Sequence, residues 1–132
     1  MLIGVDVLRT GELDRLLTRA WFRRYTYAAE ELAVADRYGA GRAREFLAGR
    51  FAGKEAALKA IRSGVGAGVT PRQVAILREE SGAPVVRLSG AAAHRAADLG
   101  IAAVQVSIAH KEDLVIAVAI AEQRHEKGDG NV

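Results

Sequence analysis

The chain has 132 residues, of which 50% are hydrophobic and 5% aromatic, so one domain with an aliphatic core is expected and a disordered chain is excluded. It contains no cysteine, which excludes a disulfide framework, a thiolate zinc site and a cysteine nucleophile, and its formal net charge of +3 does not by itself indicate a nucleic-acid binder. No apolar run approaches the ~20 residues that span a bilayer, and no basic segment precedes a long apolar stretch at the N-terminus, so we expect a cytoplasmic protein without a signal peptide or a membrane partner.

The N-terminal part combines one strand with helical patterns. Residues 1–7 are apolar and predict a short strand, in which Asp6 is unusual because strands disfavour aspartate. Helical patterns cover 12–20 and 28–38, and the aromatic and basic stretch 21–25 connects them.

A long helix is expected from about residue 43 to 62, between Gly39-Ala40-Gly41 and Ser63-Gly64, where glycine is the common C-terminal cap. A turn at 80–83 indicates that the next two strands form a hairpin, and continuous apolar character indicates that the last strand is central. The expected elements are strands at 73–79, 84–88, 104–108 and 114–121, and a helix over 90–98 capped by Ser89. The polar residues 124–132 predict a frayed tail.

The long helix carries one acidic residue beside its apolar stripe. At 100° per residue, the stripe consists of Leu47, Phe51 and Leu58. Glu55 lies only about 40° from Phe51 on this wheel, at the margin of the buried face, and Lys59 follows one turn later. Taken alone, Glu55 and Lys59 also fit an ordinary i,i+4 ion pair on a helix surface.

Other candidates are open when each is taken singly. Asp6 could simply cap the next helix, and His110 could be a hydrogen-bonded residue at a turn between two strands. The glycine-rich loop 64–68 follows a helix, whereas a phosphate loop precedes one, so a Walker-type motif is rejected.

Taken together, three segments in this order resemble the holo-(acyl-carrier-protein) synthases, the small single-domain branch of the 4′-phosphopantetheinyl transferases. They are Ile3-Gly4-Val5-Asp6, Phe46-Leu47-Ala48-Gly49-Arg50-Phe51-Ala52-Gly53-Lys54-Glu55-Ala56 followed by Lys59, and Val106-Ser107-Ile108-Ala109-His110. Gly82-Ala83-Pro84 is a weaker fourth match. The resemblance implies an α+β fold, mainly an antiparallel sheet packed against the long helix, with residues 1–123 as the transferase domain and 124–132 as a polar tail.

The resemblance also implies a metal and a reaction. In that family one Asp and one Glu hold Mg²⁺ beside the pyrophosphate of coenzyme A, and the matching residues are Asp6 and Glu55, with Mn²⁺ as the other candidate ion. The phosphopantetheine arm of coenzyme A passes to a Ser hydroxyl of an apo acyl carrier protein, and adenosine 3′,5′-bisphosphate leaves. Glu55 and Lys59 are the expected catalytic residues, and the base that takes the Ser proton is Glu55, Lys59 or a metal-bound water.

Coenzyme A contacts follow from the same resemblance. Arg50 and His110 match positions at the 3′-phosphate, and Pro84 matches a position at the adenine. Lys59 and Gly64 match further contacts to coenzyme A. The forked donors of Arg50 suit a phosphate dianion, although an exposed helix arginine is the alternative.

The carrier protein of this family presents an acidic helix, so a basic surface is expected. Residues 9–24 contain five basic residues and two acidic ones, and a solvated amphipathic helix is the alternative interpretation. The expected docking residues are Arg9, Arg15, Arg19 and Arg24. Whether the carrier serves fatty-acid, polyketide or peptide synthesis is left open.

Family members of this size are homotrimers with active sites shared between neighbouring subunits, and we expect the same here, because a lone small domain cannot bury every Ala-, Val- and Ile-rich strand. The alternative function is a non-catalytic module of the same fold that binds coenzyme A or docks a carrier protein. The presence of Asp6, Glu55 and Lys59 together favours the enzyme. An RNA-binding role fits the pI of about 9.6, but without an aromatic platform or a dense basic stripe no nucleic-acid partner is expected.

Overall fold

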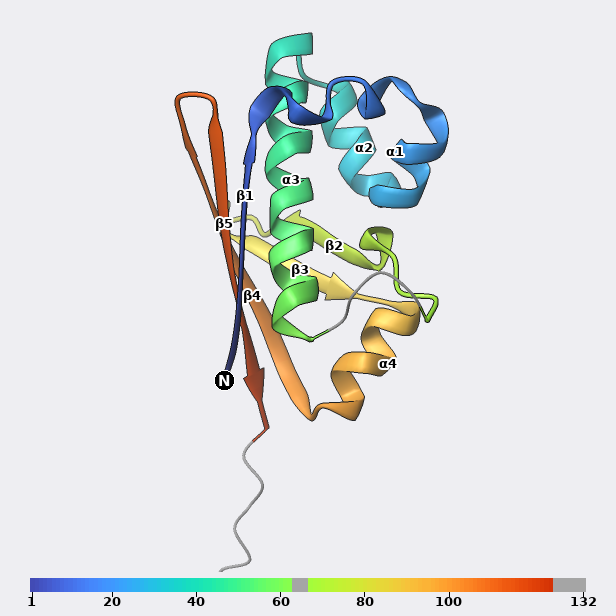
Figure 1. Cartoon of the computed structure of the whole chain (residues 1–132), viewed down its shortest axis with the longest axis vertical. Helices are drawn as coiled ribbons and strands as arrows, with labels where there is room; N and C mark the ends of the chain where they lie inside the picture. The colour runs from blue at the N-terminus through green and yellow to red at the C-terminus, as the bar shows by residue number, and fades with distance from the viewer. Residues whose placement is uncertain (63–66, 125–132) are drawn as a thin grey trace, which may run out of the picture.

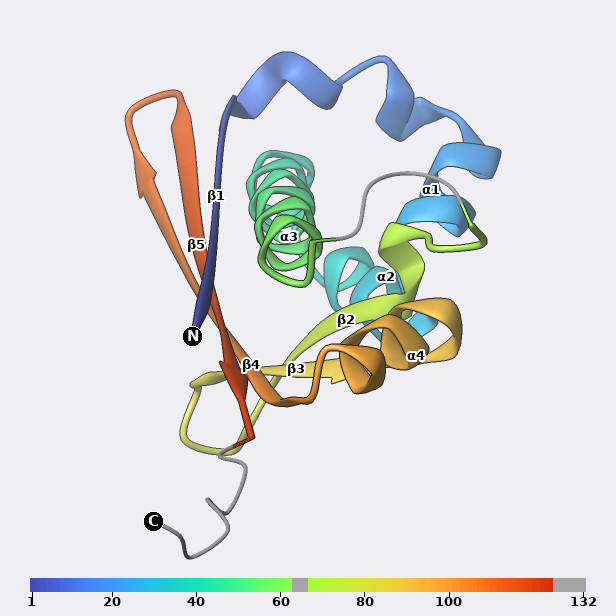
Figure 2. The same ribbon diagram turned by 60° about the horizontal axis from the view of Figure 1, so that its bottom comes forward.

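A computed structural model describes residues 1–62 and 67–124, and the elements below lie within these ranges (Figure 1). Three antiparallel strands form the main sheet in the order β1-β5-β4. They are β1 (Leu2–Arg9), β5 (Leu114–Gln123) and β4 (Ile101–Lys111). The helix α3 (Ala40–Ala60) packs along one face of this sheet (Figures 1 and 2). This confirms the predicted α+β fold, with a long helix against an antiparallel sheet and the last strand in the centre.

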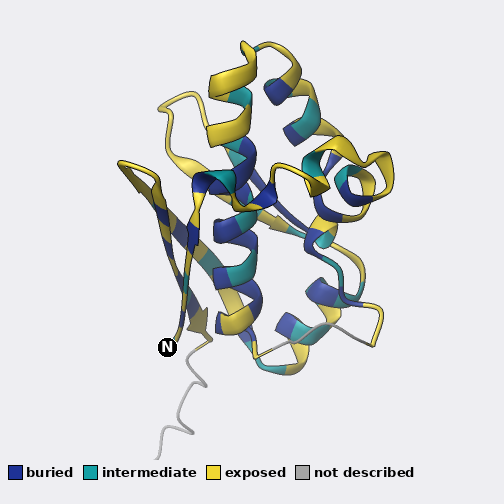
Figure 3. Ribbon diagram, turned by 45° about the horizontal axis from the view of Figure 1, so that its top comes forward, coloured by how far each residue is buried: buried dark blue, intermediate teal, exposed yellow. Residues whose placement is uncertain are grey.

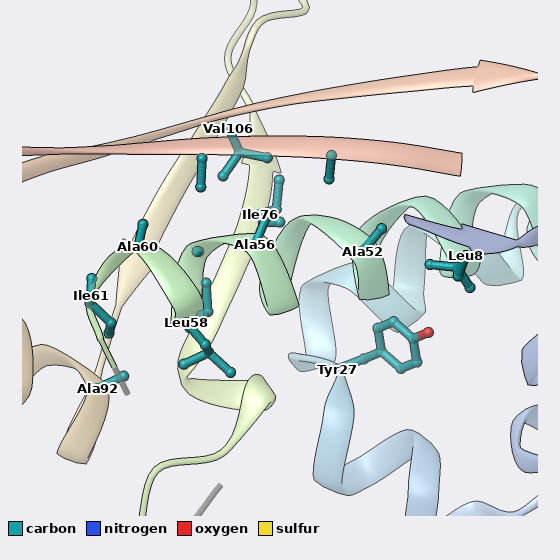
Figure 4. Close-up of a cluster of buried hydrophobic side chains, with 14 of the residues drawn as sticks. Leu8, Tyr27, Ala52, Ala56, Leu58, Ala60, Ile61, Ile76, Ala92 and Val106 are labelled. Atoms are coloured by element: carbon teal, nitrogen blue, oxygen red, sulfur yellow. The ribbon is translucent and has the colours of Figure 1, made fainter. Parts of the chain in front are cut away.

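Small side chains let α3 and the sheet approach closely. On β5, Ala117, Ala119 and Ala121 point inward and are fully buried, and Ala52 and Ala56 of α3 are fully buried opposite the sheet. Figure 3 shows buried residues along the side of α3 that faces the strands, and Figure 4 shows the packing between them. The core is therefore aliphatic and dense, as the scarcity of aromatic residues predicts.

One glycine sets the position of β1 on the helix. A Cβ atom at Gly4 would lie 2.0 Å from the carbonyl oxygen of Ala56, so only glycine allows the strand this close. Side chains alternate along a strand, so the next residue of β1 that faces α3 is Asp6. The predicted strand over 1–7 is confirmed and extends to Arg9.

A second, two-stranded sheet pairs β2 (Val74–Arg78) with β3 (Pro84–Leu88) and confirms the predicted hairpin. It lies beside β4, at the side of the main sheet away from β1 (Figure 2). The 3-10 helix η3 (Pro71–Gln73) precedes it, and α4 (Gly90–Asp98) follows it. Ser89 stands at the N-cap of α4 as expected, although its hydroxyl makes no capping hydrogen bond.

The segment between β1 and α3 differs from its prediction. It consists of η1 (Thr10–Leu13), η2 (Leu16–Thr18), α1 (Ala20–Thr26) and α2 (Ala29–Asp36). The helix predicted over 12–20 is wrong, because Leu13 is the one buried side chain there and an amphipathic helix needs an apolar stripe. The stretch 21–25, predicted as a connection, lies in α1, whose Phe22 is buried beside Tyr27. The helix predicted over 28–38 is confirmed as α2.

The long helix begins and ends earlier than its pattern predicts. It starts at Ala40, directly after Gly39 at the N-cap, and ends at Ala60. Arg62, with a φ of +57°, takes the left-handed conformation that glycine usually supplies after a helix. The predicted cap at Gly64 and the predicted tail beyond Arg124 lie outside the described residues. No helix within the described ranges is long and apolar enough to cross a membrane.

A buried ion pair joins α3 to α2 and β2. The Lys54 Nζ lies 2.5 Å from a Glu31 carboxylate oxygen, and both side chains are fully buried. The ammonium also donates to the carbonyl oxygens of Pro71 and Val74, and the other Glu31 oxygen accepts the Ile76 N–H. Every charge of the pair is therefore hydrogen-bonded, as a buried pair requires. Burial lowers the pKa of Lys54 to about 8, against the opposing effect of Glu31.

Candidate active site

Asp6 meets the end of α3 where Lys59 projects from the helix. The Lys59 Nζ donates to the Asp6 Oδ1 at 3.0 Å and to the Val5 carbonyl oxygen at 2.9 Å. Lys59 therefore pairs across the contact between helix and strand, and not with Glu55 one turn earlier on its own helix. Asp6 lies within β1, so it does not cap a helix.

Glu55 is half-buried on α3, and the charge of Asp6 affects its carboxyl group. Burial raises the pKa of the Glu55 carboxyl group, the nearby charge of Asp6 raises it further, and the Lys59 ammonium opposes both. The Asp6 and Glu55 carboxylates repel each other when both are charged. A cation bound by both would relieve this repulsion.

The donor set fits a hard cation that takes few protein ligands. Among residues 1–62 and 67–124, no cluster of three or more His, Cys, Asp or Glu side chains could hold a metal ion. Within the part of the chain that the structure describes, Asp6 and Glu55 offer two carboxylates without a third ligand of this kind beside them. This suits Mg²⁺, which is commonly held by one or two carboxylates while phosphates and water complete its octahedron. Zinc, which takes three or four protein ligands, does not fit this pair.

A second polar cluster lies in a pocket of about 140 Å³ on another side of α3. Its lining residues are Tyr38, Arg42, Glu45, Phe46, Gly49, Arg50, Arg78 and His110. A Cβ atom at Gly49 would lie 2.9 Å from the His110 Nε2, so glycine makes room for the imidazole against the helix. The pocket therefore brings together Arg50 and His110, the two residues expected at the 3′-phosphate.

Arg50 is held rigidly at this pocket and is only 8% exposed, which contradicts the alternative of an exposed helix arginine. Its Nε donates to the Ile76 carbonyl oxygen at 3.0 Å, and its guanidinium lies 4.6 Å from the centroid of the Phe46 ring. Burial, and then the charge of Arg78, lower the pKa of Arg50, although arginine stays protonated in proteins. Two neighbouring guanidinium groups favour an anion beside them.

Arg42 and Arg78 are pocket residues that the sequence patterns did not reveal. Arg42 lies on α3 two turns before Arg50, and Arg78 is the last residue of β2. The spacing of Arg42 from Arg50 on one helix was a usable signal, since residues eight apart share a face. Arg78 had no such signal, because its position depends on how the hairpin packs against α3.

The two clusters lie on different sides of the helix. Arg50 and Glu55 are five positions apart, which separates them by about 140° around α3. Asp6 stands on β1 and His110 on β4, the two edges of the sheet, with β5 between them. Within one chain, the body of α3 thus separates the carboxylates from the basic pocket.

The other expected coenzyme A contacts lie apart from that pocket. Pro84, at the start of β3, lines a groove of about 550 Å³ with residues 102–106 of β4. Lys59 belongs to the carboxylate cluster, and Gly64 lies outside the described residues.

The four arginines expected at the carrier protein are all exposed. Arg9 ends β1 and pairs with Asp113 at 3.0 Å. Arg15 and Arg19 flank η2, and Arg24 lies on α1. The end of β1, the two residues beside η2 and the short helix α1 therefore carry this basic surface, so it does not lie on one amphipathic helix.

Similarity to known proteins agrees with the motifs. Residues 2–119 match the model of the 4′-phosphopantetheinyl transferase superfamily. The holo-(acyl-carrier-protein) synthase of Desulfovibrio desulfuricans is 35% identical over 122 residues, covering 91% of this chain and 95% of that protein. The enzyme of the same name from Halorhodospira halophila is 38% identical over 120 residues, covering 89% of this chain and 94% of that protein.

Solved structures are similar over almost the whole chain. The holo-(acyl-carrier-protein) synthase from Neisseria meningitidis superposes with a TM-score of 0.82 at 30% identity, covering 93% of this chain and 100% of that one. The Bacillus anthracis enzyme, solved in complex with coenzyme A (3′,5′-ADP), gives a TM-score of 0.77 at 27% identity, covering 93% of this chain and 96% of that one. The chain belongs to the 4′-phosphopantetheinyl transferase superfamily and, within it, to the holo-(acyl-carrier-protein) synthase family. It is therefore an enzyme of the phosphopantetheine-transferring kind, as its three motifs predicted.

Proposed function

We propose that this enzyme transfers the 4′-phosphopantetheine arm of coenzyme A to a Ser hydroxyl of an apo acyl carrier protein in a Mg²⁺-dependent reaction. The Ser oxygen forms a bond to the β-phosphorus, and the bond from that phosphorus to the bridging pyrophosphate oxygen breaks. Adenosine 3′,5′-bisphosphate leaves, and the Ser proton passes to a base. The observation that carries this proposal is the joining of Asp6, Glu55 and Lys59 across β1 and α3.

Asp6 and Glu55 would hold Mg²⁺. When bound, this ion would neutralise negative charge on the pyrophosphate of coenzyme A. Lys59 adds a second positive charge at the same place, because its ammonium already reaches the Asp6 carboxylate. Phosphoryl-type transfer depends mainly on positioning and on such charge stabilisation. The base that takes the Ser proton would be Glu55, Lys59 or a metal-bound water.

The basic pocket would take the 3′-phosphate of coenzyme A. Arg50 presents fixed charge there, His110 adds a ring nitrogen, and Arg78 adds a further guanidinium. Pro84 would line the adenine subsite in its separate groove.

A site shared between subunits of a homotrimer would reconcile these separate positions. Coenzyme A cannot pass through the body of α3, whereas the carboxylate edge of one subunit can meet the basic pocket of its neighbour. The outer face of the main sheet supports such assembly, because it exposes a continuous row of apolar side chains. They are Ile3, Val5 and Val7 on β1, with 48–56% of their surface exposed, and Ile116 and Val118 on β5, with 37–40% exposed.

The basic surface formed by Arg9, Arg15, Arg19 and Arg24 would dock the acidic carrier protein. All four side chains reach solvent, as electrostatic steering requires. A cytoplasmic location remains a prediction.

The deciding experiment measures the intact mass of several apo carrier proteins after incubation with coenzyme A and the purified chain. We expect the mass gain of one phosphopantetheine arm with Mg²⁺ or Mn²⁺ and none after chelation. The Asp6→Ala variant should give no gain. A wild-type chain that modifies no carrier under any of these conditions would indicate the alternative, a binding module of the same fold.

A further inference from the structure

The backbone at the end of the short helix α1 is bound by a side chain that lies far away in sequence. The Arg72 Nη1 donates to the carbonyl oxygens of Arg24 at 3.0 Å and Tyr27 at 2.6 Å, across separations of 48 and 45 residues. The last carbonyl groups of a helix have no partner within it, and a cation there also meets the negative end of the helix dipole. Arg72 therefore closes the C-terminal end of α1.

The base of Arg72 is itself anchored to α3. Arg72 lies in η3, between Pro71 and Val74, whose carbonyl oxygens both accept hydrogen bonds from the buried Lys54 Nζ, at 3.2 and 2.7 Å. Lys54 is a residue of α3 and immediately precedes Glu55. A continuous set of contacts thus runs from the helix that carries Glu55, through η3 and Arg72, to the end of α1.

Tyr27, the fully buried C-cap residue of α1, also holds this end, because its hydroxyl donates to the Leu47 carbonyl oxygen of α3 at 2.7 Å. The helix has only seven residues and buries Phe22 and Thr26. The ion pair between Arg23 and Asp36 is loose, at 3.8 Å. A helix this short is not stable by itself, so its orientation depends on such contacts.

We infer that Arg72 is a positioning residue for carrier-protein docking, which rests on the proposed function of α1 and Arg24. Arg72 donates its hydrogen bonds to the backbone of Arg24 and Tyr27. It thereby holds α1 at the angle at which the Arg24 side chain faces solvent. Arg72 does not line the basic pocket and bonds neither Asp6 nor Glu55, so we expect it to affect carrier binding alone.

The test is the kinetics of Arg72→Ala, with carrier protein and coenzyme A varied separately. We expect the KM for the carrier to rise roughly three- to tenfold, about the worth of one ordinary hydrogen bond, with KM for coenzyme A and kcat unchanged. Amide hydrogen exchange over residues 20–27 should speed up, and the fluorescence anisotropy of Trp21, the single tryptophan of the chain, should fall. Arg72→Lys, which keeps a donor, should recover part of each effect.

Arg87→Ala is the matched control. Arg87 and Arg72 both act on the carboxyl group of Glu30, so each variant removes one guanidinium from the same region, but Arg87 bonds Glu30 and not α1. An equal rise of the carrier KM in Arg87→Ala would show a general charge effect and overturn the inference. So would an unchanged carrier KM, or a raised one with unchanged exchange in α1.

Failure of the inference and of the proposed function give different results. If the wild-type chain transfers nothing, the proposed function is wrong, and the direct binding of a labelled carrier to wild type and Arg72→Ala then tests the docking role. If the wild type transfers normally and Arg72→Ala matches it, only the inference fails. Arg72→Lys serves as the test variant if Arg72→Ala does not fold.

Discussion

Glu55 stands half-buried beside a second carboxylate, an arrangement that opposes folding as long as no cation is bound. We expect Glu55→Gln to raise the free energy of unfolding of the metal-free chain by up to about 1 kcal/mol, because the neutral amide removes a repelled, partly buried charge. The same variant should lose about 100-fold or more of transfer activity. Urea unfolding with and without Mg²⁺ checks this, with exposed Glu80→Gln as the control. A Glu55→Gln chain still stabilised by Mg²⁺ like the wild type would show that the ion binds elsewhere.

Arg50 differs from Glu55 because its role is binding. We expect Arg50→Ala to raise the KM for coenzyme A by about tenfold or more while the KM for the carrier protein changes little, since one buried charge-assisted contact to phosphate is lost. Dephospho-coenzyme A, which lacks the 3′-phosphate, supplies the control. The wild type should bind it more weakly than coenzyme A, whereas Arg50→Ala should barely distinguish the two. Equal discrimination by both proteins would remove Arg50 from the phosphate site.

At the scale of elements, local patterns predicted the strands and the long helix, and tertiary contacts decided the rest. The half-buried position of Glu55 followed from the 100° wheel, and β5 was placed centrally by its apolar run. The segment 12–20 was misread because only Leu13 of its three leucines is buried, which is too little for an amphipathic helix. Asp6 and Lys59 lie 53 positions apart, so no helix or strand periodicity could place them together. Only the resemblance of their two motifs to one family connected them.

The Lys54–Glu31 pair shows the same limit, since two charged residues 23 positions apart gave no sign of being buried. We expect Glu31→Gln to lower the free energy of unfolding by about 3–5 kcal/mol, because it leaves the Lys54 ammonium buried without a counter-charge. The double variant Glu31→Leu with Lys54→Met should recover most of that loss. Glu30 lies next to Glu31 on α2 and forms an exposed ion pair with Arg87 of β3. Glu30→Gln breaks only that exposed pair, so it is the control and should leave stability nearly unchanged. Denaturant unfolding measures all three, and a small effect of Glu31→Gln would contradict the importance of the pair.

At the scale of the molecule, α3 separates the carboxylate cluster from the basic pocket, so we expect a complete active site to form only between subunits of an oligomer. We expect three times the 14.0 kDa chain mass in solution by light scattering. Val118→Asp should give monomers without activity, because Val118 pairs directly with Val5 on the exposed apolar face.

Mixing subunits tests the shared site itself. Asp6→Ala subunits keep the basic pocket and Arg50→Ala subunits keep the carboxylates, so a trimer containing both has some interfaces where the intact halves meet. Co-expressed with different tags and assayed at coenzyme A below its KM, the mixture should recover about a quarter of wild-type activity, the fraction of interfaces that random assembly restores. Each variant alone should stay far below that value. A site built within one chain cannot be restored in this way, so a mixture no more active than its components would place both clusters of each working site in a single subunit.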